Sequence, residues 1–208
     1  MVIRDMPSLY RSETAALIQT FLFNLGFSVK HAEVSSVIQV NDQPFENGLH
    51  AWEKRKLKHS KQSEITVKKM PHDTAKLIYS FIHQCRTEKG YELSMSFEDL
   101  QHVMTTHPDH YILFNAFDKD KLIAGSVAIR VHQHILYNFY IDHASSYDHL
   151  SPVVQVIEAL YDYCREQKIR ILDLGTSALP GGPNFPLLDF KRHLGGKHAS
   201  RLTFEKKL

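Results

Sequence analysis

The sequence is short of the features that define several large classes of protein. It has two cysteines, Cys85 and Cys164, and no stretch approaches the ~18 consecutive apolar residues that a membrane-spanning helix needs. Neither sign of charge is in clear excess, since 25 lysine and arginine residues stand against 23 acidic ones. These counts argue against a disulfide scaffold, a membrane protein and a protein whose net charge alone drives nucleic-acid binding.

The cysteines and the N-terminus bear on the compartment. Both cysteines fall on the apolar stripes of expected helices, which favours buried, reduced thiols over a disulfide or a nucleophile. The first residues, MVIRDMPSLYRSE, lack the apolar core of a secretory signal peptide. We therefore expect a cytoplasmic protein.

Fourteen histidines raise the question of a metal site. His132 and His134 lie at a turn, and His107 and His110 lie on either side of a proline. Neither pair has carboxylate or cysteine partners at the spacing that a zinc site requires. The sequence predicts no metal.

What the sequence does contain is a series of helical and strand patterns. Helices are expected over 8–27, 48–63, 73–90, 96–107, 151–164 and 187–194. Strands are expected over 27–40, 64–69, 111–117, 122–131, 135–142, 169–175 and 200–207, with a loop over 176–186. Short turns join the third, fourth and fifth of these strands, so those three should pair antiparallel. The helix before 169–175 allows that strand to lie parallel to its predecessor.

The expected helix ends carry specific local signals. Asp73 and Ser151 are expected N-caps, and Pro152 follows Ser151 at the first helical position. Near the C-terminus, a short helix runs into Gly195 and Gly196 and then at once into the last strand. Glycine permits the positive φ that ends a helix abruptly, so the pair should let the last strand enter the sheet.

The closing stretch and the order of elements together carry a family resemblance. The residues concerned are Asn184, Phe190, Lys191, Leu194, Gly195 and Gly196. After residue 64 the order is a strand, two helices, three antiparallel strands, a helix, a strand, a helix and a final strand. This resembles the GNAT N-acetyltransferase superfamily, and in particular its FemAB-like branch, whose best-known members add amino acids to peptidoglycan precursors. In that branch a Lys/Arg-rich helix, here 48–63, precedes the catalytic lobe.

The resemblance implies an α/β fold of the α+β type, with a mixed, mostly antiparallel central sheet flanked by helices. The GNAT-like acyltransferase domain is expected over 46–208. It follows a helix-strand appendage at 1–45 that resembles the tail of a first lobe. One departure is the segment DHASSYDHLSP at 142–152, which lacks the glycines of the usual phosphate-binding loop. The helix that starts after Ser151 still offers free amides and a positive dipole end to an anion.

The activity implied by the resemblance is N-acyl transfer. The acyl group is expected to move from an acyl-thioester, acetyl-CoA or another acyl-CoA, to an amine acceptor by direct attack. That acceptor would be an amine-bearing small molecule or a peptidoglycan precursor. Two alternatives stay open. One is an aminoacyltransferase that uses aminoacyl-tRNA, and RNA is expected as a partner only under this alternative. The other is a non-catalytic GNAT-fold module for binding or homodimerisation.

The resemblance also implies which residues form the site. Asp142, at the end of strand 135–142, is expected to be the base, although a solvated acid at a strand end would give the same pattern. The backbone at Ile141 and Asp142 is expected to polarise the thioester, and Ser151 to help bind its phosphates. Asn184 is expected to anchor donor or acceptor, in both a catalytic and a cofactor-binding role.

Further candidates come from charge and strand alternation. Lys191 is expected to stabilise a phosphate, carboxylate or oxyanion, the alternative being a solvated lysine. Tyr140 and Asn138 should share a face with Asp142 and line one cleft, although a strand tyrosine is more often a core residue. Asp173 lies in an apolar strand and needs a partner, which favours a structural carboxylate over a site residue.

Overall fold

The computed structural model describes residues 1–179 and 181–207. The chain divides into two compact units: unit 1 combines Met1–Gln39 with Asp173–Leu208, and unit 2 is Val40–Leu172. This division crosses the expected boundary after residue 45, because the N-terminal elements share a unit with the end of the chain. The assignment of 46–208 to one acyltransferase domain stays a prediction.

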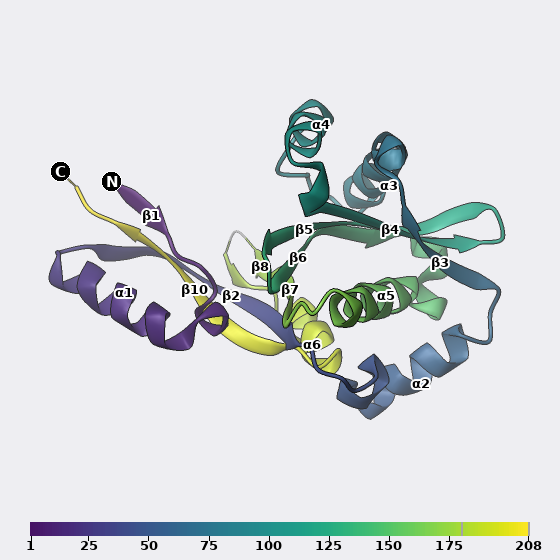
Figure 1. Ribbon diagram of the computed structural model, residues 1–208, viewed down its shortest axis with the longest axis horizontal. Coiled ribbons are helices and arrows are strands. Elements are labelled where there is room, and N and C mark those ends of the chain that lie inside the picture. Colours follow the sequence, from purple (N-terminus) through teal and green to yellow (C-terminus); the bar gives the residue numbers. More distant parts are fainter. Residues whose placement is uncertain (180, 208) are drawn as a thin grey trace. The chain divides into compact units, whose positions relative to one another are not determined.

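Unit 2 is built around four antiparallel strands. The strands are β3 (Ile65–Met70), β4 (Tyr111–Asp118), β5 (Lys121–His132) and β6 (Ile135–His143). The α-helices are α2 (Ala51–Ser60), α3 (Ala75–Glu88), α4 (Phe97–Thr106) and α5 (Pro152–Glu166). Each strand pairs with its successor in antiparallel register, which confirms the expected meander. Helices α3 and α4 cover one face of these strands and α5 covers the other (Figure 1).

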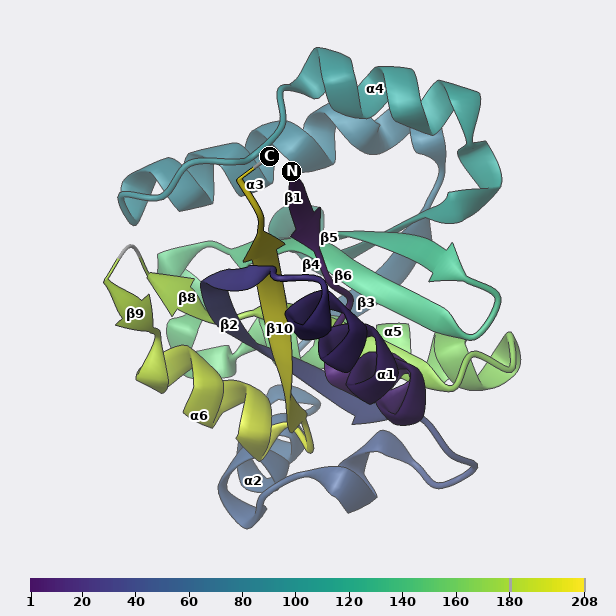
Figure 2. The ribbon, with the colours of Figure 1, turned by 90° about the vertical axis from the view of Figure 1, so that its left-hand side faces the viewer.

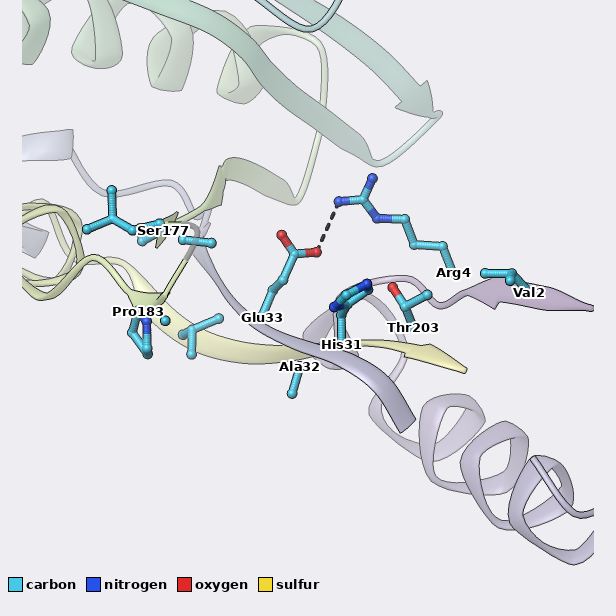
Figure 3. Close-up of a pocket in the computed structure, with 12 residues that line it drawn as sticks. Val2, Arg4, His31, Ala32, Glu33, Ser177, Pro183 and Thr203 are labelled. Atoms are coloured by element: carbon cyan, nitrogen blue, oxygen red, sulfur yellow. Dashed lines mark hydrogen bonds and ion pairs between the residues drawn. The ribbon is translucent and has the colours of Figure 1, made fainter. Parts of the chain in front are cut away.

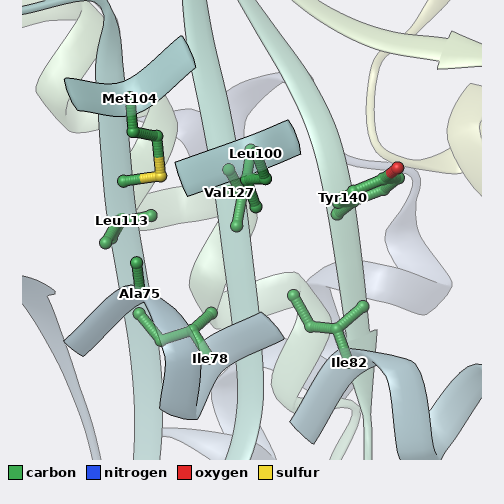
Figure 4. Packing of buried hydrophobic residues seen from close by; sticks show 8 residues of the cluster. All are labelled: Ala75, Ile78, Ile82, Leu100, Met104, Leu113, Val127 and Tyr140. Atoms are coloured by element: carbon green, nitrogen blue, oxygen red, sulfur yellow. The ribbon is translucent and has the colours of Figure 1, made fainter. Parts of the chain in front are cut away.

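One apolar cluster of unit 2 lies under α3 and α4. Ile78 and Ile82 of α3 and Leu100 of α4 are fully buried against Leu113 of β4 and Val127 of β5 (Figure 4). Ala75, Met104 and Tyr140 complete the cluster. Burying one such aliphatic side chain contributes roughly 1.5–3 kcal/mol, so this layer fixes α3 on the sheet.

Unit 1 combines segments from both ends of the chain. Its elements are β1 (Val2–Arg4), α1 (Ser12–Asn24), β2 (Ser28–Gln39), β8 (Ala178–Leu179), β9 (Gly182–Pro183), α6 (Phe185–His193) and β10 (Lys197–Glu205). Strand β10 pairs antiparallel with β1 on one side and β2 on the other. Helix α1 lies along these strands (Figure 2), and its Leu22 packs with Phe27 and Phe204. Strand β7 (Ile171–Thr176) contains the boundary between the units.

Several element ends differ from the expectation. Asp73 is not the N-cap of α3, because residues 72–74 form a short 3-10 helix (η3) and Thr74 takes that position without a side-chain cap. The short strand β1 and the β8–β9 hairpin were not predicted, since segments of two or three residues show no periodicity. Pro180, inside the expected loop, lies outside the described residues.

Both cysteines are free and buried, as expected. Burial raises the pKa of the Cys85 thiol to about 11 and that of the Cys164 thiol to about 12. Neither thiol is therefore suited to act as a nucleophile. Within residues 1–179 and 181–207, no helix combines the length and apolarity that crossing a membrane requires.

Two glycines end α6. Gly195 has a φ of 84°, and its amide donates to the Arg192 carbonyl. The Gly196 amide donates to the Lys191 carbonyl, which completes a Schellman motif. A Cβ on Gly196 would lie 2.6 Å from the Lys191 carbonyl oxygen. The expected abrupt end of the helix before the last strand is confirmed. Glycine is required at 195 because of the positive φ and at 196 because of the close approach to the Lys191 carbonyl.

We predict that Gly196→Ala destabilises the protein by about 1–3 kcal/mol, because the new methyl group must displace backbone rather than a mobile side chain. Urea unfolding measures the change through the transition midpoint. Gly48→Ala is the matched control, since a Cβ there meets nothing within 4 Å, and it should change stability by less than about 0.5 kcal/mol. Equal midpoints for the two variants would contradict the close approach of residue 196 to α6.

Candidate functional site

Lys191 is the most unusual of the expected site residues, because its ammonium group is buried. The residue is 7% exposed, and Nζ donates to the carbonyl oxygens of Gly175 and Thr176, at 2.9 Å each. Both carbonyls belong to the end of β7. Lys191 is therefore not an ordinary solvated lysine.

Asp173 lies two residues before the first of those carbonyls. Its Oδ2 accepts a 2.6 Å hydrogen bond from the Tyr10 hydroxyl, and its Oδ1 accepts the Gly175 amide at 2.7 Å. Burial raises the pKa of the Asp173 carboxyl, while these two hydrogen bonds and the charges of Lys191 and Arg201 oppose the rise. The carboxylate has the partners that its buried position demands.

Asn184 lies at the N-cap of α6. The side-chain oxygen of Asn184 accepts a hydrogen bond from the Leu187 backbone amide at 3.2 Å. The backbone amide of Asn184 donates to the Ser177 carbonyl at 3.0 Å. The helix therefore begins at Phe185, two residues earlier than expected. Asn184 and Lys191 are thus fixed by the same short helix to residues 175–177, the segment that leaves β7. A role for Asn184 in holding a substrate stays a prediction.

The raised pKa of Asp173 has a consequence for stability. Folding favours the protonated carboxyl, so the stabilising contribution is complete below the unfolded pKa of about 3.9 and is lost as pH rises through the folded pKa. Relative to Asp173→Asn, the wild-type protein should therefore lose stability as pH rises above about 4. Urea unfolding of both proteins between pH 4 and pH 8 gives the difference.

Asp189→Asn is the control for this experiment, because Asp189 is 65% exposed and forms an ion pair with Arg192 on the surface of α6. Because an exposed ion pair contributes little, this replacement should change the free energy of unfolding by less than about 1 kcal/mol. A wild-type protein that gains stability over Asp173→Asn with rising pH would show that the folded pKa is lowered instead.

In unit 2, Asp142 is buried and held by cations. Its Oδ2 lies 3.0 Å from Arg86 Nε, and its Oδ1 accepts from Lys89 Nζ at 2.5 Å and from the His143 amide at 2.8 Å. Arg86 also donates to the Ile141 carbonyl at 3.1 Å. These contacts attach the end of α3 to the end of β6. Asp142 is therefore not a solvated acid, and its role as a base stays a prediction.

A β-bulge changes the direction of side chains along β6. Tyr140 pairs with Val127, whereas Asn138 pairs with the next residue of β5, Ala128. Neighbouring residues of β5 point to opposite faces, so Tyr140 and Asn138 do too. The expected shared face is wrong for Asn138, whose side-chain oxygen accepts from Ser126. Tyr140 does share a face with Asp142, which pairs with Gly125.

Tyr140 belongs to the core and also carries a polar contact. Its ring is buried in the cluster under α3 and α4 and stacks on Phe139, with 3.9 Å between centroids. Figure 4 shows its hydroxyl directed away from the other labelled side chains, and the hydroxyl pairs with Ser94 at 2.9 Å. The core reading is confirmed, and a catalytic role stays a prediction.

Ser151 occupies the N-cap position of α5, with Pro152 directly after it as expected. Its backbone is left-handed, with a φ of 46°, and its hydroxyl makes no cap to the helix. The hydroxyl instead faces the Asp148 carbonyl at 3.4 Å. Among the described residues, no group of three or more metal-ligating side chains is arranged to hold an ion.

Some of these contacts had no signal in the sequence. Tyr10 lies 163 residues from Asp173, and no motif joins the two. Lys89 is one residue before a helix-ending glycine, a common place for a cation, but nothing indicated Asp142 as its partner.

Comparisons with known proteins place the chain in a family. A model of the acetyltransferase (GNAT) domain matches residues 52–192, more than half of the chain. The chain therefore belongs to the GNAT acetyltransferase family. No curated protein matches the sequence.

Solved structures show that the fold is FemAB-like. The structure of FemX has a TM-score of 0.74 at 12% identity, over 97% of this chain and 71% of that one. L-PGS from Bacillus licheniformis has a TM-score of 0.63 at 8% identity, over 99% and 68%. A glucosamine N-acetyltransferase region of a fungal β-N-acetylglucosaminidase reaches 0.56 at 11% identity, over 92% of this chain and 23% of that one. At these identities the likeness concerns the fold.

Proposed function

We propose that the protein is an N-acyltransferase that moves an acyl group from acyl-CoA to an amine. The observation that carries the proposal is the buried ammonium group of Lys191 at the end of β7, in a chain that belongs to the GNAT family. A fixed cation of this kind stabilises negative charge that develops on a carbonyl or a phosphate. A cytoplasmic location is part of the proposal, because both cysteines are free thiols.

The proposed reaction is a direct displacement. The acceptor amine attacks the carbonyl carbon of the thioester, the C–N bond forms, and the C–S bond breaks as the thiolate leaves. The amine loses a proton to a base, for which Asp142 is proposed, and the thiolate is released as free CoA. Lys191 stabilises the oxyanion, while Asn184 and Tyr140 position the reactants. Backbone at Ile141 and the start of α5 after Ser151 bind the donor.

The donor is tested first by binding. Acetyl-CoA at a hundred times its dissociation constant stabilises the native state by about 2.7 kcal/mol, which raises the melting temperature. Incubation with acetyl-CoA and a panel of primary amines should then release free CoA thiol and give amines heavier by one acetyl group.

We predict that Lys191→Met lowers kcat/KM by about a hundredfold or more, because an oxyanion-stabilising cation is lost. Asn184→Asp keeps the N-cap of α6, since aspartate caps as well as asparagine, but it places a negative charge beside an anionic donor. It should therefore raise KM for acetyl-CoA in a folded protein. Lys197→Met, which removes an exposed lysine bonded to Gln39, is the control and should keep full activity. Unchanged rates in the Lys191 variant would contradict the proposal.

The runner-up keeps the fold and replaces the donor with an aminoacyl-tRNA. It is favoured by helix α2, where Lys54, Arg55 and Lys58 are exposed and Trp52 is 53% exposed. Arg55 lies over the Trp52 ring at 5.5 Å. Exposed cations beside an aromatic ring suit RNA, because they offer both phosphate contacts and a stacking surface.

This alternative makes its own prediction. If α2 binds tRNA, Lys54→Gln/Lys58→Gln should reduce the slope of log Kd against log salt by about 0.7–0.9 for each removed charge. Filter binding of an unmodified tRNA transcript between 50 and 200 mM salt measures the slope. The control Lys76→Gln/Lys119→Gln removes two exposed lysines elsewhere in unit 2 and should leave the slope unchanged. Stabilisation by acetyl-CoA and none by tRNA would decide for the first proposal.

A further inference from the structure

Unit 1 contains a pocket of about 630 Å³ beside the Lys191 site. Its walls come from β1, β2, β10 and the β8–β9 hairpin. A volume of roughly 300–1,000 Å³ is typical of small-molecule sites. The residues that line the pocket include Arg4, His31, Glu33, Ser177, Leu179 and Thr203.

Two opposite charges face each other in this pocket. Arg4 and Glu33 form an ion pair at 3.0 Å, with side chains 56% and 22% exposed. Figure 3 shows the two side chains reaching toward one another on one side of β2, while Ala32 points to the other side. An ion pair this exposed contributes little to stability, so a ligand that offers each charge a new partner can separate it at small cost.

The pocket wall is also continuous with the site. Thr176, directly before Ser177, offers its carbonyl to Lys191, and the Ser177 carbonyl accepts from Asn184. Whatever lies against Ser177 is thus one residue away from the carbonyls that hold the Lys191 ammonium group.

We infer that this pocket binds the acceptor as a zwitterion, an amino acid or short peptide with a free amine and a free carboxylate. Glu33 receives the ammonium group and Arg4 receives the carboxylate. The role of this ligand as the acyl acceptor rests on the proposed function. Its binding to the pocket does not, because binding requires neither acyl-CoA nor acyl transfer.

Calorimetry with L-alanyl-L-alanine as the probe tests the binding. The wild-type protein should bind it, whereas N-acetyl-L-alanyl-L-alanine and L-alanyl-L-alanine amide, which each lack one charge, should bind at least about tenfold more weakly. Glu33→Gln should remove the preference for the free amine, and Arg4→Gln the preference for the free carboxylate. The control Glu205→Gln, which breaks the exposed Lys30–Glu205 ion pair between β2 and β10, should bind like wild type.

The outcomes also separate this inference from the proposed function. Dipeptide binding without acyl transfer would keep the pocket and contradict the transferase. Acyl transfer that proceeds equally well in Glu33→Gln and Arg4→Gln would keep the transferase and overturn the pocket. Failure of the wild-type protein to bind any of the three peptides at millimolar concentration would overturn the pocket as a zwitterion site.

Discussion

The architecture at the end of the chain depends on the burial of one ammonium group. A buried cation must have acceptors, and Lys191 finds them in the Gly175 and Thr176 carbonyls at the end of β7. Helix α6 must therefore lie close to β7 and stop soon after Lys191. The Schellman motif at Gly195 and Gly196 provides that stop, and β10 can then return to pair with β2.

Unit 2 has a similar constraint, in which the buried charged group is a carboxylate instead of an ammonium group. Asp142 is a buried anion at the end of β6, and Arg86 and Lys89 from the end of α3 surround it. Breaking such a pair by removing one partner leaves an uncompensated charge, so the contact fixes α3 against that strand end. The bulge beside Tyr140 adds a local kink in the same strand. Each unit therefore holds a buried charge at a strand end next to residues proposed for the site.

Sequence patterns were informative where a physical requirement is local. The Gly195–Gly196 pair and the strand pairing from 111 to 142 follow from turn chemistry, and the structure confirms them. The start of α5 at Pro152 is also confirmed, although the Ser151 hydroxyl does not cap the helix. The orientation of the Asn138 side chain was predicted wrongly, because the alternation of residues along a strand does not reveal a one-residue shift in strand register. The Tyr10–Asp173 contact was also beyond reach, since one sequence shows periodicity within elements but not the pairing of distant side chains. The substrate roles of Asp142 and Asn184 depend on chemistry that no pattern of residues tests.

Residues 175–177, which leave β7, hold Lys191 and the pocket wall at Ser177 close together and in fixed positions. Three successive carbonyls, those of Gly175, Thr176 and Ser177, accept hydrogen bonds from Lys191 or from the backbone of Asn184. The Ser177 amide in turn donates to the Val34 carbonyl of β2. This short segment is thus held from both sides, and neither its carbonyls nor the pocket wall at Ser177 can shift without breaking several hydrogen bonds at once. A cation held on such a rigid support is preorganised, which is the condition under which an electrostatic contact lowers a reaction barrier.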